Sequence, residues 1–305
     1  MEFFTHNTNI DFMSQRKWAF LFSVTLIFFS VWSLIFNGLN LGLDFTGGIQ
    51  IEVNYDKPPD CNQIRQRLRR IGLEAIVQAY GSSSDIMIKL KLQKYFTQQQ
   101  MIETVLGVLT DAKLQRAEMI GAQIGKKLVT DGILAIIIAL LGTMVYITLR
   151  FEYRFAVSAI ISLIHDPILI LGLFSFFHVE FDSITLAALL TVIGYSLNDT
   201  IVVYDRAREN FRKIRKATPA EILNLSINQT LSRTMMISGL TLVVVIALLV
   251  YGGPMLKGFS LAMIIGIVIG TYSSIYVAGA LALFFGLDRH HLLITRKKII
   301  DTSTP

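Results

Sequence analysis

The chain has 305 residues, of which 53% are hydrophobic and 16% are charged. Because soluble proteins carry about a quarter charged residues, this composition excludes an ordinary soluble protein and favours one embedded in lipid. The net charge of +6 is compatible with nucleic-acid binding, but most Lys and Arg residues lie beside apolar segments, where they set membrane orientation. The single cysteine, Cys61, excludes an internal disulfide.

Six apolar segments are long enough to cross a hydrocarbon core about 30 Å thick, which takes about 17 residues or more of helix. They lie at 17–36, 129–149, 155–176, 184–204, 234–251 and 259–285. The first occupies the position of a signal peptide, but its apolar run is longer than that of a signal peptide and 37–40 offers no small-residue cleavage site. We therefore expect a retained anchor and six transmembrane helices.

The Lys and Arg residues of the short connections predict the orientation. The N-terminus, 150–154, 205–233 and the C-terminus hold fifteen of them, whereas 177–183 and 252–258 hold only Lys257. The positive-inside rule then places both termini in the cytoplasm. The long 37–128 segment then faces outward, which in a bacterium means the periplasm. We expect four parts: 1–36 with the first helix, 37–128 as a periplasmic domain, 129–285 with helices two to six, and 286–305 as a cytoplasmic tail.

The 37–128 segment predicts an α+β domain. Its pattern indicates a strand at 49–55, a helix from 61 to about 71, strands at 73–80 and 85–92 joined by a Gly-Ser turn at 81–84, a helix from 97 to about 110, and a strand at 113–120. The order β-α-β-β-α-β is that of the ferredoxin-like fold, which hosts many functions and names none. Four arginines crowd the first helix, and we interpret them as a solvated face rather than a nucleic-acid patch.

Asp199 is the most informative residue of the membrane part. It lies in the fourth apolar segment six residues before Asp205, at a depth of roughly 9 Å along a helix. An aspartate at mid-helix costs about 2.5–3.5 kcal/mol on insertion scales. Helical spacing places it on one face with Thr191, Tyr195 and Asn198, which predicts that this stripe points into a bundle or a wet cavity.

Such a carboxylate has two interpretations. It either loads and releases a proton or is neutralised permanently by a structural partner, and intramembrane acids usually mark pathways, which favours the first. Tyr195, Asn198 and Thr200 are secondary candidates for the same pathway.

Arg233 is the natural partner of Asp199. Thr218, Pro219 and Glu221 form a helix-start signature, so the fifth helix begins inside the cytoplasmic loop and enters the membrane past Arg233. The alternative is an arginine that reaches back to the lipid headgroups. Spacing alone does not decide between the two.

His165 and Asp166 precede Pro167 in the middle of the third segment. Proline frees a backbone carbonyl there, and the two ionisable groups either join a proton relay or form a satisfied polar kink. We treat them as a secondary site.

The last helix carries a packing signal, because Gly266, Gly270 and Ser274 recur at every fourth position and predict close approach of another helix. The basic cluster at 206–216 is expected to touch anionic lipid.

No nucleophile–base set, Gly-rich phosphate loop or Gly-x-Ser-x-Gly elbow occurs, and 37–128 has no histidine or cysteine pair. We expect no enzymatic activity, no cofactor and no metal.

Four motifs resemble the SecF family, membrane subunits that partner SecD in bacterial protein export. Residues 42–48, GLDFTGG, are similar to the family signature at the start of its periplasmic domain, and include Asp44, Gly47 and Gly48. Residues 194–200 resemble its fourth-helix motif, 230–234 the start of its fifth helix, and 266–274 its sixth helix. The likeness covers nearly the whole chain.

The resemblance implies more than the residues alone predict. It implies a half of an RND-type transporter that pairs with a SecD-like subunit, works with the SecYEG channel on preproteins, and uses the proton gradient through periplasmic domain movement. It also implies that Asp199 and Arg233 carry the proton pathway. The role of Asp44 stays open, since it and the two glycines shape either a tight turn or a hinge. The alternative function is a stand-alone half transporter that homodimerises to export a small molecule.

Overall fold

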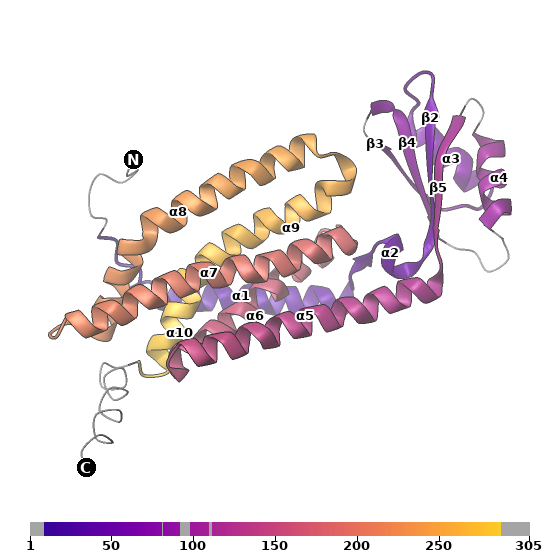
Figure 1. Ribbon diagram of the computed structural model, residues 1–305. Coiled ribbons are helices and arrows are strands. Elements are labelled where there is room, and N and C mark those ends of the chain that lie inside the picture. The colour runs from indigo at the N-terminus through magenta and orange to yellow at the C-terminus, as the bar shows by residue number, and fades with distance from the viewer. Residues whose placement is uncertain (1–8, 81, 92–97, 110–111, 288–305) are drawn as a thin grey trace, which may run out of the picture.

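The computed structural model describes residues 9–80, 82–91, 98–109 and 112–287. It consists of a long helical bundle with a β-rich lobe at one end (Figure 1). The expected tail residues Arg289, Arg296, Lys297 and Lys298 and the expected helix start at Thr97 lie outside the described residues.

Within these ranges six helices are long and apolar enough to cross a membrane, which confirms the predicted spans. They are α1 (Arg16–Phe36), α5 (Ala122–Arg150), α6 (Tyr153–Phe176), α7 (Ser183–Lys213), α8 (Pro219–Tyr251), and α9 (Gly253–Tyr272) with its continuations η1 (Ser273–Ala278) and α10 (Gly279–Phe284). The helices α6, α7 and α9 form the buried centre, whereas α1, α5 and α8 lie outside them.

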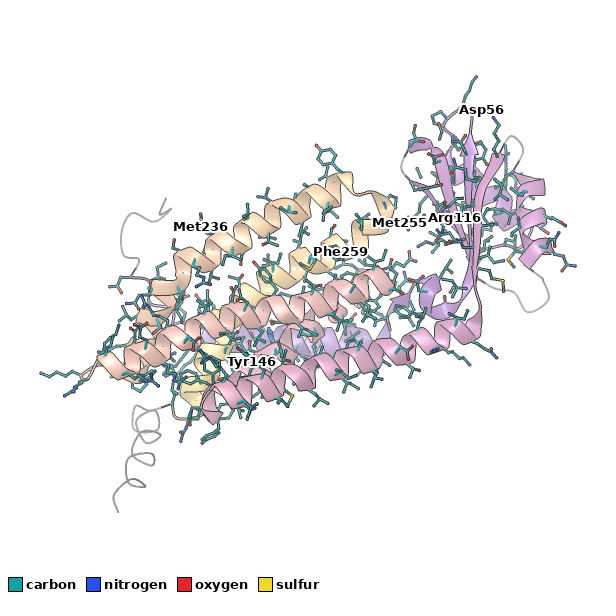
Figure 2. All side chains as sticks on the ribbon, in the orientation of Figure 1. Asp56, Arg116, Tyr146, Met236, Met255 and Phe259 are labelled. Carbon is teal, nitrogen blue, oxygen red and sulfur yellow. The ribbon has the colours of Figure 1, made fainter. Side chains whose placement is uncertain are left out.

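The outer helices carry the surface expected of a protein in lipid. Large apolar side chains are exposed along α1, α5 and α8, among them Tyr146 and Met236 (Figure 2). The labelled charged side chains Asp56 and Arg116 lie instead on the β-rich lobe. The chain is therefore a multi-pass membrane protein with a β-rich lobe at one end of its helical bundle.

The start of α8 follows from its cap. Thr218 Oγ1 accepts a hydrogen bond from the backbone N–H of Glu221 at 3.3 Å, and a Glu221 carboxylate oxygen accepts one from the backbone N–H of Thr218 at 2.8 Å. Pro219 occupies the first turn, where its missing N–H costs nothing. The helix begins outside its apolar segment, as predicted.

The lobe contains β2 (Gly48–Tyr55), α3 (Cys61–Arg70), β3 (Ala75–Tyr80), β4 (Ser82–Lys91), α4 (Gln98–Val108) and β5 (Ala112–Ile120). The sheet has the antiparallel order β3-β4-β2-β5. Alternate β2 side chains, Ile49, Ile51 and Val53, are fully buried with residues of α3 and α4, so both helices cover one face of the sheet. Ser82 to Ser84, expected in a turn, belong to β4, because Tyr80 already pairs with Ser82.

A small parallel pairing joins the lobe to the bundle. The strand β1 (Asn40–Leu41) follows α1, the strand β6 (Glu180–Phe181) precedes α7, and Asn40 pairs with Glu180. The short helix α2 (Leu43–Thr46) then leads into β2. The start of the lobe is thus fixed to the N-terminal end of α7.

The helices α7 and α9 approach closely at two glycines. A Cβ on Gly266 would collide with the Val192 side chain, and a Cβ on Gly270 would lie 3.1 Å from the Ser196 Cβ. Ser274 lies in η1 and donates a hydrogen bond to the carbonyl of Thr271 at 3.0 Å.

Replacing Gly266 by alanine is expected to lower the free energy of unfolding by about 1–3 kcal/mol, the usual cost of overpacking. Thermal or denaturant unfolding of the chain in detergent or lipid measures this loss. Gly194→Ala on α7 is the control, because no described atom outside its own helix lies within 4 Å of its added Cβ. An equal loss in both variants would contradict the packing described for α7 and α9.

Candidate functional site

Asp199 lies on α7 in the membrane part of the bundle and is 2% exposed. Its carboxylate makes no hydrogen bond or ion pair with any described residue, and Oδ2 is fully enclosed without a partner. A buried carboxylate without hydrogen bonds is unstable when ionised, because nothing replaces the water it has lost. This arrangement favours binding of a proton.

The other residues of the predicted polar stripe differ in burial: some are buried or half-buried and some are exposed. Tyr195 is half-buried and donates a hydrogen bond to Ser238 on α8 at 3.3 Å. Thr200 is buried and donates to the carbonyl of Ser196 at 3.2 Å. Thr191 and Asn198 are exposed, so the prediction that they point inward is wrong for the isolated chain. The stripe is about 100° wide on a helical wheel, and only its Asp199 edge turns inward.

Arg233 lies on the neighbouring helix α8 and is exposed. It forms no ion pair with Asp199 in the described structure. Arg233 and Asp199 thus lie on two helices that pack against each other, without a contact between their side chains.

His165 and Asp166 occupy the middle of α6, where they are 3% and 0% exposed. Asp166 Oδ1 lies 2.9 Å from His165 Nδ1. Asp166 Oδ2 contacts Ser196 Oγ closely and lies 2.9 Å from Ser273 Oγ. Asp166 therefore links three parts of the bundle, α6, α7 and η1.

Ser196 and Ser273 were not expected from the sequence as partners of Asp166. Ser196 precedes Asp199 by three positions on α7, and this helical spacing was the available signal. The sequence pattern pointed to Ser274, whereas the neighbouring Ser273 contacts Asp166. Ser273 follows Gly270 by three positions and Gly266 by seven, so it shares the face of these glycines on an ordinary α-helix.

Asp44 contacts the N-terminal end of α7, at the end of the bundle next to the lobe. Its Oδ2 accepts a hydrogen bond from the backbone N–H of Ser183, the first residue of α7, at 3.0 Å. Asp182 provides a second cap, since its Oδ1 accepts from the backbone N–H of Thr185 at 2.8 Å. The residue that begins the lobe thus holds the start of the helix that carries Asp199.

The two glycines after Asp44 have separate structural reasons. Gly47 ends α2 with a φ of 76°, a conformation that side chains other than that of glycine rarely adopt. Gly48 has an ordinary conformation, but a Cβ there would lie 2.5 Å from the carbonyl oxygen of Leu90. Both glycines let the chain turn tightly into the sheet.

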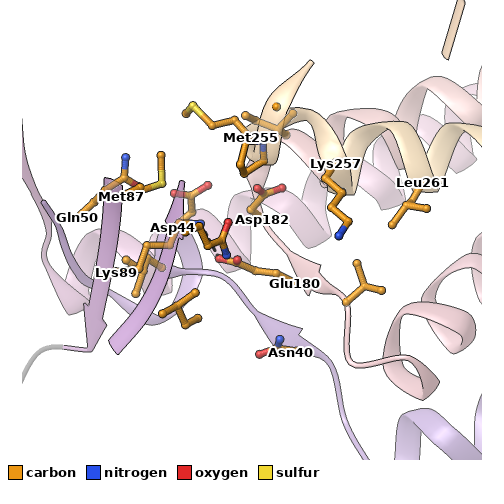
Figure 3. Close-up of a pocket in the computed structure, with 18 of the residues that line it drawn as sticks. Asn40, Asp44, Gln50, Met87, Lys89, Glu180, Asp182, Met255, Lys257 and Leu261 are labelled. Carbon is orange, nitrogen blue, oxygen red and sulfur yellow. Dashed lines mark hydrogen bonds and ion pairs between the residues drawn. The ribbon is translucent and has the colours of Figure 1, made fainter. Parts of the chain in front are cut away.

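A pocket of about 950 Å³ lies between the sheet and the outer helix ends (Figure 3). Lys89 of β4 and Glu180 of β6 line it and form an ion pair at 2.9 Å, with side chains only 16% and 22% exposed. Asp44 and Asp182 line the same pocket, and Lys257 reaches it from α9. The ion pair is a third attachment between the lobe and the bundle, after the β1–β6 pairing and the Asp44 cap.

The remaining polar cluster lies on the open face of the sheet and is fully hydrogen-bonded. Burial and a hydrogen bond to Glu52 raise the pKa of Tyr80 to about 12. Hydrogen bonds from Asn54, Ser82 and Gln115 lower the pKa of the Asp85 carboxyl. Because these groups satisfy one another, the cluster stabilises the sheet and is no candidate for a functional site.

The chain matches the family described as protein export membrane protein SecD/SecF, C-terminal, over residues 100–288, and the SecD/SecF GG motif over residues 32–59. It is 47% identical to the protein translocase subunit SecF of Vibrio alginolyticus over 290 residues, covering 93% of this chain and 92% of the relative. The SecF of Escherichia coli O157:H7 is also 47% identical, with 93% and 90% covered.

Solved structures show the same likeness. The crystal structure of SecDF, a translocon-associated membrane protein from Thermus thermophilus, is 33% identical and superposes with a TM-score of 0.80. The match covers 91% of this chain and 39% of that chain. A second SecDF structure, in a super-membrane-facing form, gives a TM-score of 0.72 at 33% identity and covers 98% and 41% of the two chains.

Replacing Asp44 by alanine is expected to speed amide hydrogen exchange at Ser183 and to destabilise the start of α7 by about 1 kcal/mol, the usual cost of a lost helix cap. Exchange measured by mass spectrometry on peptides that cover 180–186 tests this. Asp56→Ala is the control, because Asp56 is 76% exposed and pairs only with Lys113. Unchanged exchange at Ser183 would show that the Asp44 contact does not hold the helix.

Proposed function

The chain belongs to the SecF family of protein-export membrane proteins, and we propose that it assists Sec-dependent export as the partner of a SecD-like subunit. In this proposal the pair acts at the SecYEG channel and uses the proton gradient across the bacterial inner membrane to move preproteins outward. The names of the relatives support an export role without enzymatic activity, and they do not favour the stand-alone half transporter. The proposal needs no cofactor.

The main observation that supports this proposal is the buried carboxylate of Asp199, which has no hydrogen-bond partner among the described residues. Ionised, it lacks any hydrogen-bond donor among the described residues, and protonated it loses the charge that makes burial unfavourable. We propose that Asp199 takes a proton from the outer side and releases it toward the cytoplasm. Tyr195, Thr200 and Asn198 flank this route on α7.

Arg233 gives the proton a mechanical effect. In the neutral state of Asp199 the guanidinium stays exposed, as it is in this structure. Loss of the proton creates a carboxylate that attracts Arg233 and draws α8 toward α7. One charge that crosses the membrane is worth about 2.3 kcal/mol per 100 mV, which biases two helix arrangements by more than about tenfold.

The contacts at the outer end of α7 support transmission to the lobe. Asp44 caps the first residue of α7, β1 pairs with β6, and Lys89 binds Glu180. A shift of α7 therefore acts on the lobe through three attachments. We propose that the lobe is a ferredoxin-like periplasmic domain whose movement assists the preprotein.

Charge distribution supports the orientation and the partners of this proposal. The excess of Lys and Arg at 205–233 favours a cytoplasmic position for that loop and for both termini, with the cluster at 206–216 on anionic lipid. Asn198 and Arg233 expose polar groups on the bundle surface, which a second membrane subunit would cover. The chain covers 39% of the solved SecDF chain, and this supports a larger assembly.

Asp199→Asn is expected to abolish the part of export that depends on the proton gradient, because the amide mimics the neutral state permanently. Preprotein export is measured in inner-membrane vesicles that contain the full complex, with and without an uncoupler. Asp205→Asn on the same helix is the control, since Asp205 is 41% exposed and pairs with Arg150. Full gradient-dependent export by the Asp199 variant would refute the proposal.

Arg233→Gln is expected to lower gradient-dependent export by about tenfold or more, because it removes the cation that the ionised Asp199 attracts. Arg233→Lys keeps the positive charge and is expected to retain part of the activity. The same vesicle assay compares both variants. Equal activity of the Gln and Lys variants would mean that the charge of Arg233 has no role in coupling.

A further inference from the structure

We propose that Asp166 is a second proton-binding carboxyl, separate from Asp199, and that the hydroxyl of Ser273 changes its hydrogen bond when Asp166 gains or loses the proton. This proposal deepens the proton-coupled function above and rests on it. It stands on the contacts of four buried side chains: His165, Asp166, Ser196 and Ser273.

The ionised state of Asp166 is fully satisfied by the residues around it. His165 Nδ1–H donates to Oδ1 at 2.9 Å, and the hydroxyls of Ser196 and Ser273 donate to Oδ2. A carboxylate with three donors is stabilised even where water is absent. Asp166 thus differs from Asp199, which has no donor.

The protonated state also finds hydrogen-bond partners without movement of any heavy atom. Ser273 Oγ lies 2.9 Å from Asp166 Oδ2 and 3.2 Å from the carbonyl oxygen of Gly270. A hydroxyl has one proton and donates to one acceptor at a time. When Oδ2 carries a proton, Asp166 donates to Ser273 Oγ and Ser273 donates to Gly270. When the proton leaves, the Ser273 hydroxyl turns back to the carboxylate.

The change in Ser273 occurs where two helices meet. Gly270 is the position at which α9 approaches Ser196 of α7, and Ser273 is the first residue of η1. Single π-helical turns are frequent at functional sites, where the backbone ladder is already interrupted. Ser196 is three residues from Asp199, so the two carboxyls share one side of α7. Protonation of Asp166 therefore acts on the contact between α7 and α9.

A separate observation indicates how a proton reaches His165 and Asp166. His165 Nε2 and Ser162 Oγ are buried and have no hydrogen-bond partner among the described residues. They lie three positions apart on α6 and so share a face of the helix. With Nδ1–H bound to Asp166, Nε2 is an acceptor that is available to an incoming proton or water molecule. His165 is thus a positioning residue that also provides the approach to Asp166.

The helices that pack against α6 differ in the ionisable groups they carry. The helix α1 has none between Lys17 and its end at Phe36, and α10 has none. The helices α5, α7, α9 and η1, which also pack against α6, contribute Lys126, Lys127, Asp131, Tyr146, Arg150, Tyr195, Asp199, Tyr204, Asp205, Arg206, Arg208, Glu209, Arg212, Lys213, Lys257, Tyr272 and Tyr276. Among the described residues, His165 is the one group that can carry a positive charge and contacts Asp166. While its imidazole is neutral, a proton is the simplest means to neutralise the Asp166 carboxylate.

The test is pH-difference infrared spectroscopy on the full-length chain in lipid vesicles, in the Asp199→Asn background. A carboxylic-acid band that titrates with pH is expected, and it should vanish in Asp199→Asn/Asp166→Asn. Adding Ser273→Ala should shift the band, because protonated Asp166 loses its acceptor. Adding Ser274→Ala should leave it unchanged, because Ser274 donates to Thr271 and does not touch Asp166. His165→Gln should move the midpoint of the titration.

Three results would overturn the proposal. Absence of an Asp166-dependent band would mean a permanently ionised carboxylate, and equal effects of the two serine variants would remove the role of Ser273. A band that responds to sodium at constant pH would assign the site to an alkali ion instead. The spectrum does not depend on export, so this proposal and the role of Asp199 in coupling can fail independently.

Discussion

The hydrocarbon layer offers no water to polar groups, so a polar side chain of the bundle finds its partner on its own helix or on a neighbouring one. Ser33 on α1 bonds to Ser175 on α6 at 2.9 Å, and Asp166 binds hydroxyls from two further helices. These contacts fix how the central helices are rotated about their axes. The Asp199 carboxylate lacks such a partner, because no described helix supplies a donor for it. Its charge is balanced only by a proton or by movement of a cation.

The sequence predicted the elements that depend on local chemistry. Apolar length identified the six spans, and the cap at Thr218 located the start of α8. The β-α-β-β-α-β order of the lobe followed from alternation and turn residues. The π-helical turns of η1 were not predicted, because their backbone pattern depends on packing against α6 and has no composition of its own. Ser82 was assigned to a turn because serine signals a turn more strongly than a strand.

The sequence predicted only those site residues that can be recognised from their depth in an apolar segment or their position on a helix face. Asp199 was identified because an acid in an apolar segment is expensive wherever the helix points. The partners of Asp166 were not identified, since Ser273 lies 107 positions away and its contact depends on the mutual rotation of two helices. The cap from Asp44 to Ser183 spans 139 positions and depends on a pairing of two-residue strands, which leaves no periodic signal.

The length of α7 has a geometric consequence for the attachments at its outer end. Sixteen residues separate Ser183 from Asp199, which at a rise of 1.5 Å per residue is about 24 Å of rigid helix. Each degree of tilt about the level of Asp199 displaces the Asp44 attachment by about 0.4 Å. The far strands of the sheet lie beyond that point and sweep a wider arc. A small tilt of α7 at the level of Asp199 would therefore produce a larger displacement of the lobe.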